Sequence, residues 1–405
     1  MTGGVGGSTI EYELKSMEKL SRDIEGIPKE EYFERIDRAT TYMKLQNIDA
    51  LYLSCSTNLR YFTNLTINLS ERLHAAVIHN SGNIVYIVPA FEKEKTLSMI
   101  LIEGNIFTWE EDEDPTISVM DSFSYLGIHH GTIAIDENTP YFVLEILQNA
   151  NNQHSFVNAK SITKPCREIK SKNEISLIRS AMDIGLEVHR RTCKILYPGI
   201  TTTQVQNFVT LAHQKLGSET PPEFNIVLFG AATAYPHGVS YSQTLQEGDM
   251  VLIDVGATVG GYYSDITRTY IFGKPTKKQR TVWELERATQ DAVFNAAKIG
   301  ASCESLDIAA RSSLEKAGFG PGYKTPGLPH RTGHGLGLDV HEHPYIVKGN
   351  TDLLAKGMCF SNEPMICIYG EFGVRLEDHI YMTDKGPQWF TKPSNSIDNP
   401  FELDI

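Results

Sequence analysis

The stretch GDMVLIDVGATVGGYYSDITRTYIFG, residues 248–273, contains two apolar runs separated by Val-Gly-Gly at positions 259–261. Such runs joined by a glycine turn predict a β-hairpin. A turn on the first two of the separating residues would place Asp254 directly opposite Asp265, and a turn on the last two would make them diagonal neighbours on one face. Two like charges among apolar side chains repel and lose hydration, and a cation between them would remove both costs. The hairpin therefore predicts a metal site, with a solvent-facing aspartate as the alternative.

A second stretch, GMCFSNEPMICIYGEFGVRLEDHIYMT at residues 357–383, predicts another hairpin with its turn near Gly370. Glu363 and Glu377 lie at similar distances from that turn, and both are surrounded by apolar residues. Arg375 shares the face of Glu377 because strand side chains alternate with period two. A single glutamate in a strand is usually a solvated edge residue. Two hairpins that each carry a pair of inward carboxylates favour a metal site instead.

The stretch PHRTGHGLGLDVHEHP, residues 329–344, holds four of the thirteen histidines of the chain. Two of them have the i, i+4 spacing of a helical zinc site, but three interspersed glycines disfavour a helix. An extended segment is predicted instead, in which the glycines let the backbone pack closely beside His334. Asp339, His341 and His343 would then alternate onto one strand face. A polar surface loop is the alternative.

A further histidine, His237, lies in LFGAATAYPHGVS at residues 228–240, about one strand ahead of Asp254. A single histidine in a loop is usually only part of the polar surface. Its position just before the first hairpin makes it a candidate for the same site.

The region from residue 30 to residue 165 alternates between helix-like and strand-like stretches, which suggests an α/β unit with a partly parallel sheet. Its predicted elements are a helix at 30–48, a strand at 49–55, a hairpin at 75–89 turning at 80–82, a strand at 131–137 and a helix at 140–150.

A domain boundary is predicted near Pro165, and the region beyond it reads as α+β. Helical spacing runs from about Ser171 to Leu216, with a break at Pro198-Gly199. Two more helices are predicted at 281–300 and 304–318, and strand hairpins lie between and after them.

Composition narrows the range of functions. The chain has 37 basic and 50 acidic residues, a formal net charge of −13, which argues against nucleic acid and anionic membrane as partners. No run of eighteen apolar residues or secretion signal is present in these 405 residues. The six cysteines are scattered, as expected for free thiols in a reducing compartment. A cytoplasmic location is therefore predicted.

Taken in order, the stretches PHG, VLIDVGATVGGYYSDITRTY, GHGLGLDVHEHP, SNEP and GVRLED resemble the motifs of the pita-bread metallopeptidases. These include prolidase, aminopeptidase P and methionine aminopeptidase, with creatinase as a metal-free relative. The resemblance covers Cys166 to about Lys392, and the region before it is similar to the creatinase-type domain of prolidases. It implies an α/β creatinase-like domain over residues 1–165, followed by a pita-bread catalytic domain over residues 166–405.

Carried over residue by residue, the resemblance implies five metal ligands: Asp254, Asp265, His334, Glu363 and Glu377. Asp265 and Glu377 would bridge two ions. Four carboxylates and one imidazole suit two divalent cations, most simply manganese, with cobalt or zinc as alternatives. Two ions roughly 3.5–4 Å apart can hold a bridging hydroxide and polarise a carbonyl.

The same resemblance places His237, His341 and Arg375 in the substrate site. Glu363 would take a proton from the attacking water and pass it to the leaving nitrogen. His341, with His237, would donate hydrogen bonds to the tetrahedral oxyanion. Arg375 would pair with a substrate carboxylate, or else orient Glu377.

The implied function is a dinuclear metallo-exopeptidase that cleaves the imide bond of Xaa-Pro dipeptides, as a cytoplasmic homodimer. The alternatives are an aminopeptidase P acting on longer Xaa-Pro peptides, a non-peptide hydrolase or lyase on the same fold, and a ligand-binding protein without activity. The five intact ligands count against the last of these. Met365 departs from the family pattern, which has glycine after Glu-Pro, and predicts a reshaped pocket wall.

Overall fold

The computed structural model describes residues 4–20, 25–150 and 153–402, and it divides the chain into two compact units. One unit is Ile27–Arg167. The other joins the N-terminal residues up to Gly26 to the part of the chain from Glu168 onward. Each unit is described by itself.

Within the described residues, the Ile27–Arg167 unit contains a six-stranded sheet in the order β4-β3-β2-β1-β5-β6. Its strands are β1 (Ala50–Leu53), β2 (Ala75–His79), β3 (Ile84–Pro89), β4 (Asn105–Trp109), β5 (Gly131–Ile135) and β6 (His154–Asn158). The pairs β1–β5, β5–β6 and β3–β4 are parallel, and β1–β2 and β2–β3 are antiparallel. The partly parallel sheet predicted from the alternation is confirmed.

Helices in this unit are α2 (Lys29–Leu45), α3 (Thr57–Thr63), η1 (Ala90–Glu92), α4 (Lys93–Met99), α5 (Pro115–Tyr125), α6 (Tyr141–Ala150) and α7 (Lys160–Arg167). The predicted hairpin is present, because Ile78 pairs with Ile84 and Gly82 has a φ of 92°. Its apolar core includes Val77 and Val85 from the strands and Phe123 from α5.

The second unit contains α1 (Ile10–Lys15), α8 (Lys172–Lys194), α9 (Thr202–Leu216), α10 (Lys277–Ala296) and α11 (Cys303–Lys316). Ser171 and Glu174 form a capping box at the start of α8, which satisfies backbone N–H groups that the first turn leaves free. The predicted break at Pro198-Gly199 falls between α8 and α9. The helix predictions for this region are confirmed.

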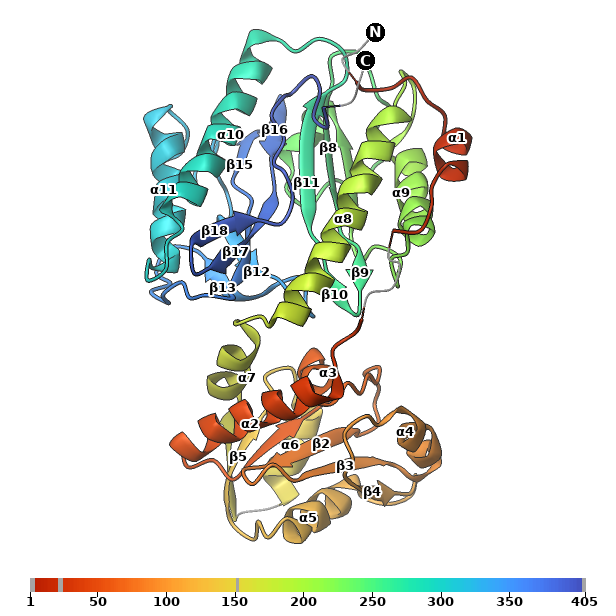
Figure 1. The fold of residues 1–405 in the computed structure, drawn as a ribbon, viewed down its shortest axis with the longest axis vertical. Helices are drawn as coiled ribbons and strands as arrows, with labels where there is room; N and C mark the ends of the chain where they lie inside the picture. Colours follow the sequence, from red (N-terminus) through yellow and green to blue (C-terminus); the bar gives the residue numbers. More distant parts are fainter. Residues whose placement is uncertain (1–3, 21–24, 151–152, 403–405) are drawn as a thin grey trace. The chain divides into compact units, whose positions relative to one another are not determined.

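Its strands form two principal sheets, in the orders β11-β8-β7 and β13-β12-β14-β17-β18 among the described residues, with the pairs β9–β10 and β15–β16 beside them. The strands are β7 (Asn225–Phe229), β8 (Met250–Val255), β9 (Thr258–Val259), β10 (Tyr262–Tyr263), β11 (Ile266–Ile271), β12 (Gly333–Gly335), β13 (Glu342–Ile346), β14 (Cys359–Asn362), β15 (Met365–Ile368), β16 (Phe372–Arg375), β17 (Asp378–Thr383) and β18 (Gly386–Trp389). In Figure 1, α8 lies beside the β8–β11 hairpin, and α9 packs on α8 and on β7. Helix α10 packs on β14, β15 and β16, and α11 packs on α10 and β13.

The described N-terminal segment, residues 4–20, packs on α8 and α9. The N–H of Gly6 donates to the carbonyl of Cys193 at 2.8 Å, and the N–H of Leu20 donates to that of Leu216 at 2.9 Å. The sequence analysis counted these residues with the first domain. The contacts explain the difference, since both partners lie more than 150 residues away and leave no local pattern in the sequence.

No described helix combines the length and the apolar character that a membrane crossing requires. The six cysteines form no disulfide among the described residues, and all of them except Cys55 are buried.

Candidate metal centre and substrate pocket

The first predicted hairpin has the second of the two registers considered. Val259 pairs with Tyr262, so the turn consists of Gly260 and Gly261, whose φ values of 59° and 78° are those of a type I′ turn. Thr267 lies directly opposite Asp254 in the β8–β11 ladder. Asp265, two residues before Thr267, is therefore the diagonal neighbour of Asp254 on the same face.

The second hairpin is also confirmed. Ile368 pairs with Phe372, which centres the turn on Gly370, and Asn362 pairs with Asp378 in the same register beyond the β15–β16 ladder. Glu363 and Glu377 therefore occupy facing positions in the gap between the two ladders.

The glycines beside His334 allow the close packing that the sequence predicted. A Cβ atom at Gly333 would lie 2.1 Å from the carbonyl oxygen of Ser361, and one at Gly335 would lie 2.2 Å from that of His343. The predicted strand over 339–343 is wrong for its first part, because β13 begins only at Glu342 and residues 336–341 form a loop. His341 therefore lies on a loop rather than on a strand face.

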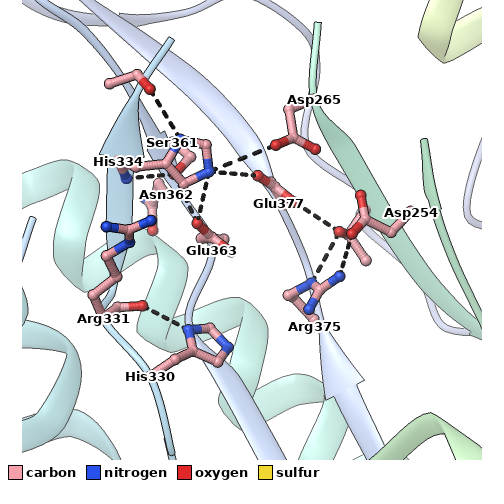
Figure 2. A network of polar contacts seen from close by, with 12 residues as sticks. Asp254, Asp265, His330, Arg331, His334, Ser361, Asn362, Glu363, Arg375 and Glu377 are labelled. Atoms are coloured by element: carbon pink, nitrogen blue, oxygen red, sulfur yellow. Dashed lines mark hydrogen bonds and ion pairs between the residues drawn. The ribbon is translucent and has the colours of Figure 1, made fainter. Parts of the chain in front are cut away.

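The five predicted ligands converge (Figure 2). The Nε2 atom of His334 lies 3.1 Å from Glu363 Oε1, 3.5 Å from Asp265 Oδ2 and 3.9 Å from Glu377 Oε1. Asp254, Asp265 and Glu377 form a neighbouring group whose ligand atoms all lie within 4.8 Å of one another. His334, Glu363 and Glu377 form another such group. Two overlapping groups thus share Glu377.

The hydrogen bond of His334 sets which tautomer a neutral ring adopts, and that tautomer leaves Nε2 as an acceptor. Its Nδ1 lies 3.0 Å from the carbonyl oxygen of Gly335, which can only accept, so Nδ1 carries the proton. An acceptor nitrogen then faces the carboxylates of Asp265, Glu363 and Glu377. With the ring neutral, a cation between these atoms would satisfy the nitrogen and the carboxylates together, and this is the tautomer that metal ligation through Nε2 requires.

Burial makes the carboxylates costly without a cation. Among the described residues, Asp254 Oδ1, Asp265 Oδ1 and Glu377 Oε1 are buried with no hydrogen-bond partner. Burial, reinforced by neighbouring carboxylates, raises the pKa of Asp265 and of Glu377 well above the ordinary range. Burial also raises the pKa of Asp254, although Arg375 opposes the shift. A divalent cation would satisfy these oxygens, so the residues fit a metal site.

Two hydroxyl groups that the sequence analysis missed orient the ligands. Thr267 donates from Oγ1 to Glu377 Oε2 at 2.7 Å. Ser361 donates from Oγ to Glu363 Oε1 at 3.0 Å and accepts from the N–H of His334 at 2.8 Å. Both hydroxyls lie two residues from a candidate ligand, so period two was a signal that could have found them.

Arg375 contacts the first hairpin in a way that the sequence analysis did not anticipate. Its Nη2 pairs with Asp254 Oδ2, its Nε donates to Thr267 Oγ1 at 3.0 Å, and its Nη1 donates to the carbonyl of Pro236 at 3.0 Å. The residue is only 3% exposed. Met365, the departure from the family pattern, is buried beside it with Sδ 4.0 Å from Nη1.

The remaining candidates are histidines. His341 is exposed, and its ring centroid lies 4.0 Å from that of His334. Partial burial, together with His334 and Arg331, lowers the pKa of His341 to about 4. His330, which received no role from the sequence, lies near Glu363 and has its Nδ1 2.7 Å from the carbonyl oxygen of Arg331 (Figure 2).

His237 is exposed on the loop after η2 (Gly230–Ala234), outside the metal-binding groups found among the described residues. It lines a cavity of about 270 Å³ with neutral polar side chains of α9, β7 and the loop that follows, including Thr202, Gln206 and Ser242. Its charged form would lower the pKa of both His330 and His341, so the three imidazoles lie near one another.

This fold, with buried carboxylates and an imidazole converging from two hairpins, defines the class of metal-dependent peptidases with a pita-bread catalytic domain. Residues 176–384 match metallopeptidase family M24, and residues 35–169 match the creatinase/prolidase N-terminal domain. The chain therefore belongs to metallopeptidase family M24. Enzymes of this family are metal-dependent hydrolases that act on peptides.

Similar proteins span nearly the whole chain. YkvY of Bacillus subtilis, which carries a provisional dipeptidase name, is 31% identical over 356 residues, 87% of this chain and 96% of YkvY. The structure of dipeptidase PepE from Mycobacterium ulcerans has 31% identity and a TM-score of 0.84, covering 91% of this chain and 97% of PepE. A prolidase from Thermococcus sibiricus has 28% identity and a TM-score of 0.82, covering 90% of this chain and 98% of that one.

Proposed function

We propose that this chain is a dinuclear metal-dependent exopeptidase that hydrolyses the imide bond of Xaa-Pro dipeptides. The observation that carries the proposal is the pair of overlapping ligand groups, with buried carboxylate oxygens that have no partner among the described residues. The similarity of this chain to proteins named prolidase and dipeptidase supports Xaa-Pro dipeptides as the substrate.

Asp254, Asp265, His334, Glu363 and Glu377 would hold two divalent cations, with Asp265 and Glu377 shared between them. Hard carboxylate oxygens suit manganese, and cobalt or zinc are the alternatives. When bound, the two cations would supply Lewis acidity for the scissile carbonyl and acidify the attacking water.

Glu363 would move the proton. Its side chain is 12% exposed, compared with 2% for those of His334 and Glu377, so it reaches furthest toward the substrate side. Held by Ser361, it would accept a proton from water and deliver it to the proline nitrogen as the C–N bond breaks. The nitrogen of the Xaa-Pro bond belongs to the proline ring and carries no hydrogen, so a peptidase for this bond cannot depend on an N–H contact there. A site that protonates this nitrogen as the bond breaks needs no such contact.

His341 would donate to the oxyanion that develops on the carbonyl, and its exposure and its ring contact with His334 support this role. His237 would line the substrate pocket beside it. The contacts of Arg375 with Asp254 and Thr267 support a role in orienting the ligands of the first hairpin more than a direct contact with a substrate carboxylate.

An aminopeptidase P that acts on longer Xaa-Pro peptides is the second candidate. The cavity of about 270 Å³ beside His237 favours it, since neutral hydroxyl and amide groups suit the main chain of residues beyond proline.

A substrate panel tests these proposals. The protein is treated with chelator, reloaded with Mn²⁺ and offered Xaa-Pro dipeptides and Xaa-Pro-Xaa tripeptides. Metal-dependent cleavage of the dipeptides is expected. Cleavage of the tripeptides alone would replace the first candidate with the second, and turnover that survives chelation would contradict both.

A further inference from the structure

The loop at residues 336–341 holds His341 beside the candidate metal centre. It joins β12 to β13 and contains bends rather than regular structure. Few backbone hydrogen bonds hold it. The N–H of Tyr263 donates to the carbonyl of Gly337 at 2.9 Å, and the N–H of Gly337 donates to that of Asp339 at 3.1 Å. The position of His341 therefore depends on what lies beneath the loop.

The carboxylate of Glu342 lies there. Glu342 Oε2 accepts from the N–H of Asp339 at 3.4 Å. A Cβ atom at Gly337 would come within 2.7 Å of Glu342 Oε1, so the loop backbone packs directly on this carboxylate. The loop therefore packs on the Glu342 carboxylate, and Glu342 itself is only 8% exposed.

Lys170 pairs with that carboxylate from another part of the chain. Its Nζ contacts Glu342 Oε1, and the two side chains are 1% and 8% exposed. The backbone of Lys170 is fixed as well, because its N–H donates to the carbonyl of Gly357 at 2.9 Å and Ile169 forms a bridge with Met358 ahead of β14. The ion pair thus connects the segment just before α8, which is held against Gly357 and Met358, to the loop of His341.

Buried ion pairs add little to stability compared with apolar side chains of the same size, because desolvation of both charges offsets their attraction. They do fix relative position, since each charge has few places where it can be neutralised. A role in geometry explains the pair better than a role in stability.

We propose that Lys170 is a positioning residue whose buried ion pair with Glu342 holds the 336–341 loop so that His341 lies over His334. The consequence for catalysis rests on the proposed function, which gives His341 its contact with the substrate. The tether itself does not depend on that function.

The test compares three variants, each with activity, metal content and hydrogen–deuterium exchange of the loop measured. Lys170→Met removes the cation. Lys170→Met/Glu342→Met removes both charges, and keeps the proposal testable if the single variant does not fold. Lys356→Met is the matched control, because its ion pair with Asp384 lies in the same unit but is 66% and 75% exposed.

For the first two variants we expect faster exchange in residues 336–341, unchanged metal content, and a loss of kcat/KM of about ten- to hundredfold, as misplacement of a catalytic group produces. The control should resemble the wild type. Combining Lys170→Met with His341→Ala should add no further loss to that of His341→Ala alone, because Lys170 acts through His341.

The outcomes separate the two proposals. Wild-type exchange in the loop of the folded paired variant would overturn the tether, whether or not any peptide is cleaved. Faster exchange with unchanged kcat/KM, or an additive loss in the His341→Ala background, would overturn the positioning role. A wild-type protein that cleaves no Xaa-Pro peptide would overturn the proposed function. Hydrogen–deuterium exchange would still test whether the Lys170–Glu342 ion pair holds the 336–341 loop.

Discussion

Single residues at the candidate metal centre carry like charges where water is excluded. Asp265 and Glu377 are 4% and 1% exposed, and each has a buried oxygen without a partner among the described residues. Such groups are tolerated only when something neutralises them. The guanidinium of Arg375 neutralises Asp254, and a divalent cation would do so for the others.

Glu377 belongs to two of the three ligand groups and is the member that joins Asp254 and Asp265 to His334 and Glu363, so its removal should have a large effect. In Glu377→Ala we expect bound metal to fall and kcat/KM to drop by roughly a hundredfold or more. Removal of a residue that only supports a metal ligand typically costs about ten- to hundredfold, and loss of a ligand itself should cost more. Elemental analysis and peptide hydrolysis measure the two effects. Glu371→Ala, at the exposed tip of the same hairpin, should change neither. A Glu377→Ala protein with both ions and normal turnover would contradict the ligand assignment.

His341 provides a contrasting case, because it lies beside the ligands but is exposed. His341→Ala should keep its metal and lose kcat/KM on the order of a hundredfold, as for removal of an oxyanion donor. Metal analysis and steady-state kinetics on the same preparation provide the measurement. Loss of metal would instead place His341 among the ligands, in the group that it forms with Asp265 and His334.

At the scale of elements, the two hairpins were predictable because residues close together in the sequence determine both their turns and their faces. Gly260-Gly261 and Gly370 fix the turns, and alternation places the carboxylates on one face. The short helix α3 was not predicted, since its seven residues gain stability from tertiary contacts such as the hydrogen bond from Arg35 to the carbonyl of Tyr61 at 2.9 Å. The edge strand β4 shows no regular alternation of burial and was missed as well.

The functional residues also divide into those positioned by nearby sequence and those positioned by contacts with distant parts of the chain. The positions of the five carboxylate and imidazole groups could be predicted, because each lies at a fixed distance from a turn or beside glycines. The contacts of Arg375 and the loop conformation of His341 could not, since the contacts of Arg375, and the ion pair beside that loop, join residues distant in the chain. Asp254 lies 121 residues from Arg375, and Lys170 lies 172 residues from Glu342.

Helix α9 carries a prediction about acid stability. His213 is fully buried, its Nδ1 donates to the carbonyl of Val209 at 2.8 Å, and its Nε2 has no partner among the described residues. Burial lowers the pKa of His213 to about 4. Below about pH 6.5 the imidazole of His213 is therefore protonated in the unfolded chain but stays neutral in the folded chain. The free energy of unfolding decreases as the pH falls from about 6.5 toward 4.

His213→Gln should flatten this dependence. At pH 5 the buried imidazole costs the wild type about 2 kcal/mol relative to pH 7, and the variant should lack that difference. Urea unfolding at the two pH values measures it. Gln214→Ala, an exposed neighbour without a titratable group, serves as the control. An unchanged difference in His213→Gln would show that the ring is protonated without cost in the fold.

At the scale of the whole molecule, all five candidate ligands lie in the unit that contains Glu168 onward. A ligand that binds only the folded state stabilises it by about 2.7 kcal/mol at a hundred times its dissociation constant. Adding Mn²⁺ to chelator-treated protein should therefore slow hydrogen exchange in residues 168–402 and leave residues 27–150 unchanged. Protection that rises equally in both regions would contradict the assignment of the metal to one unit.

The homodimer and the cytoplasmic location stay predictions. Sedimentation velocity measures the oligomeric state and so tests the homodimer.

The contacts of residues 4–20 with α8 and α9 also impose an order of events during synthesis. Gly4 lies 189 residues ahead of Cys193, whose thiol approaches its carbonyl oxygen at 3.8 Å. At about 5–20 residues per second, a ribosome needs roughly 10–40 s to make the intervening chain. All residues of the Ile27–Arg167 unit are synthesised during that interval. The N-terminal segment cannot dock in the same interval, because α8 and α9 have not yet been translated. A nascent-chain release assay should therefore find the segment open to protease until the ribosome has passed α9.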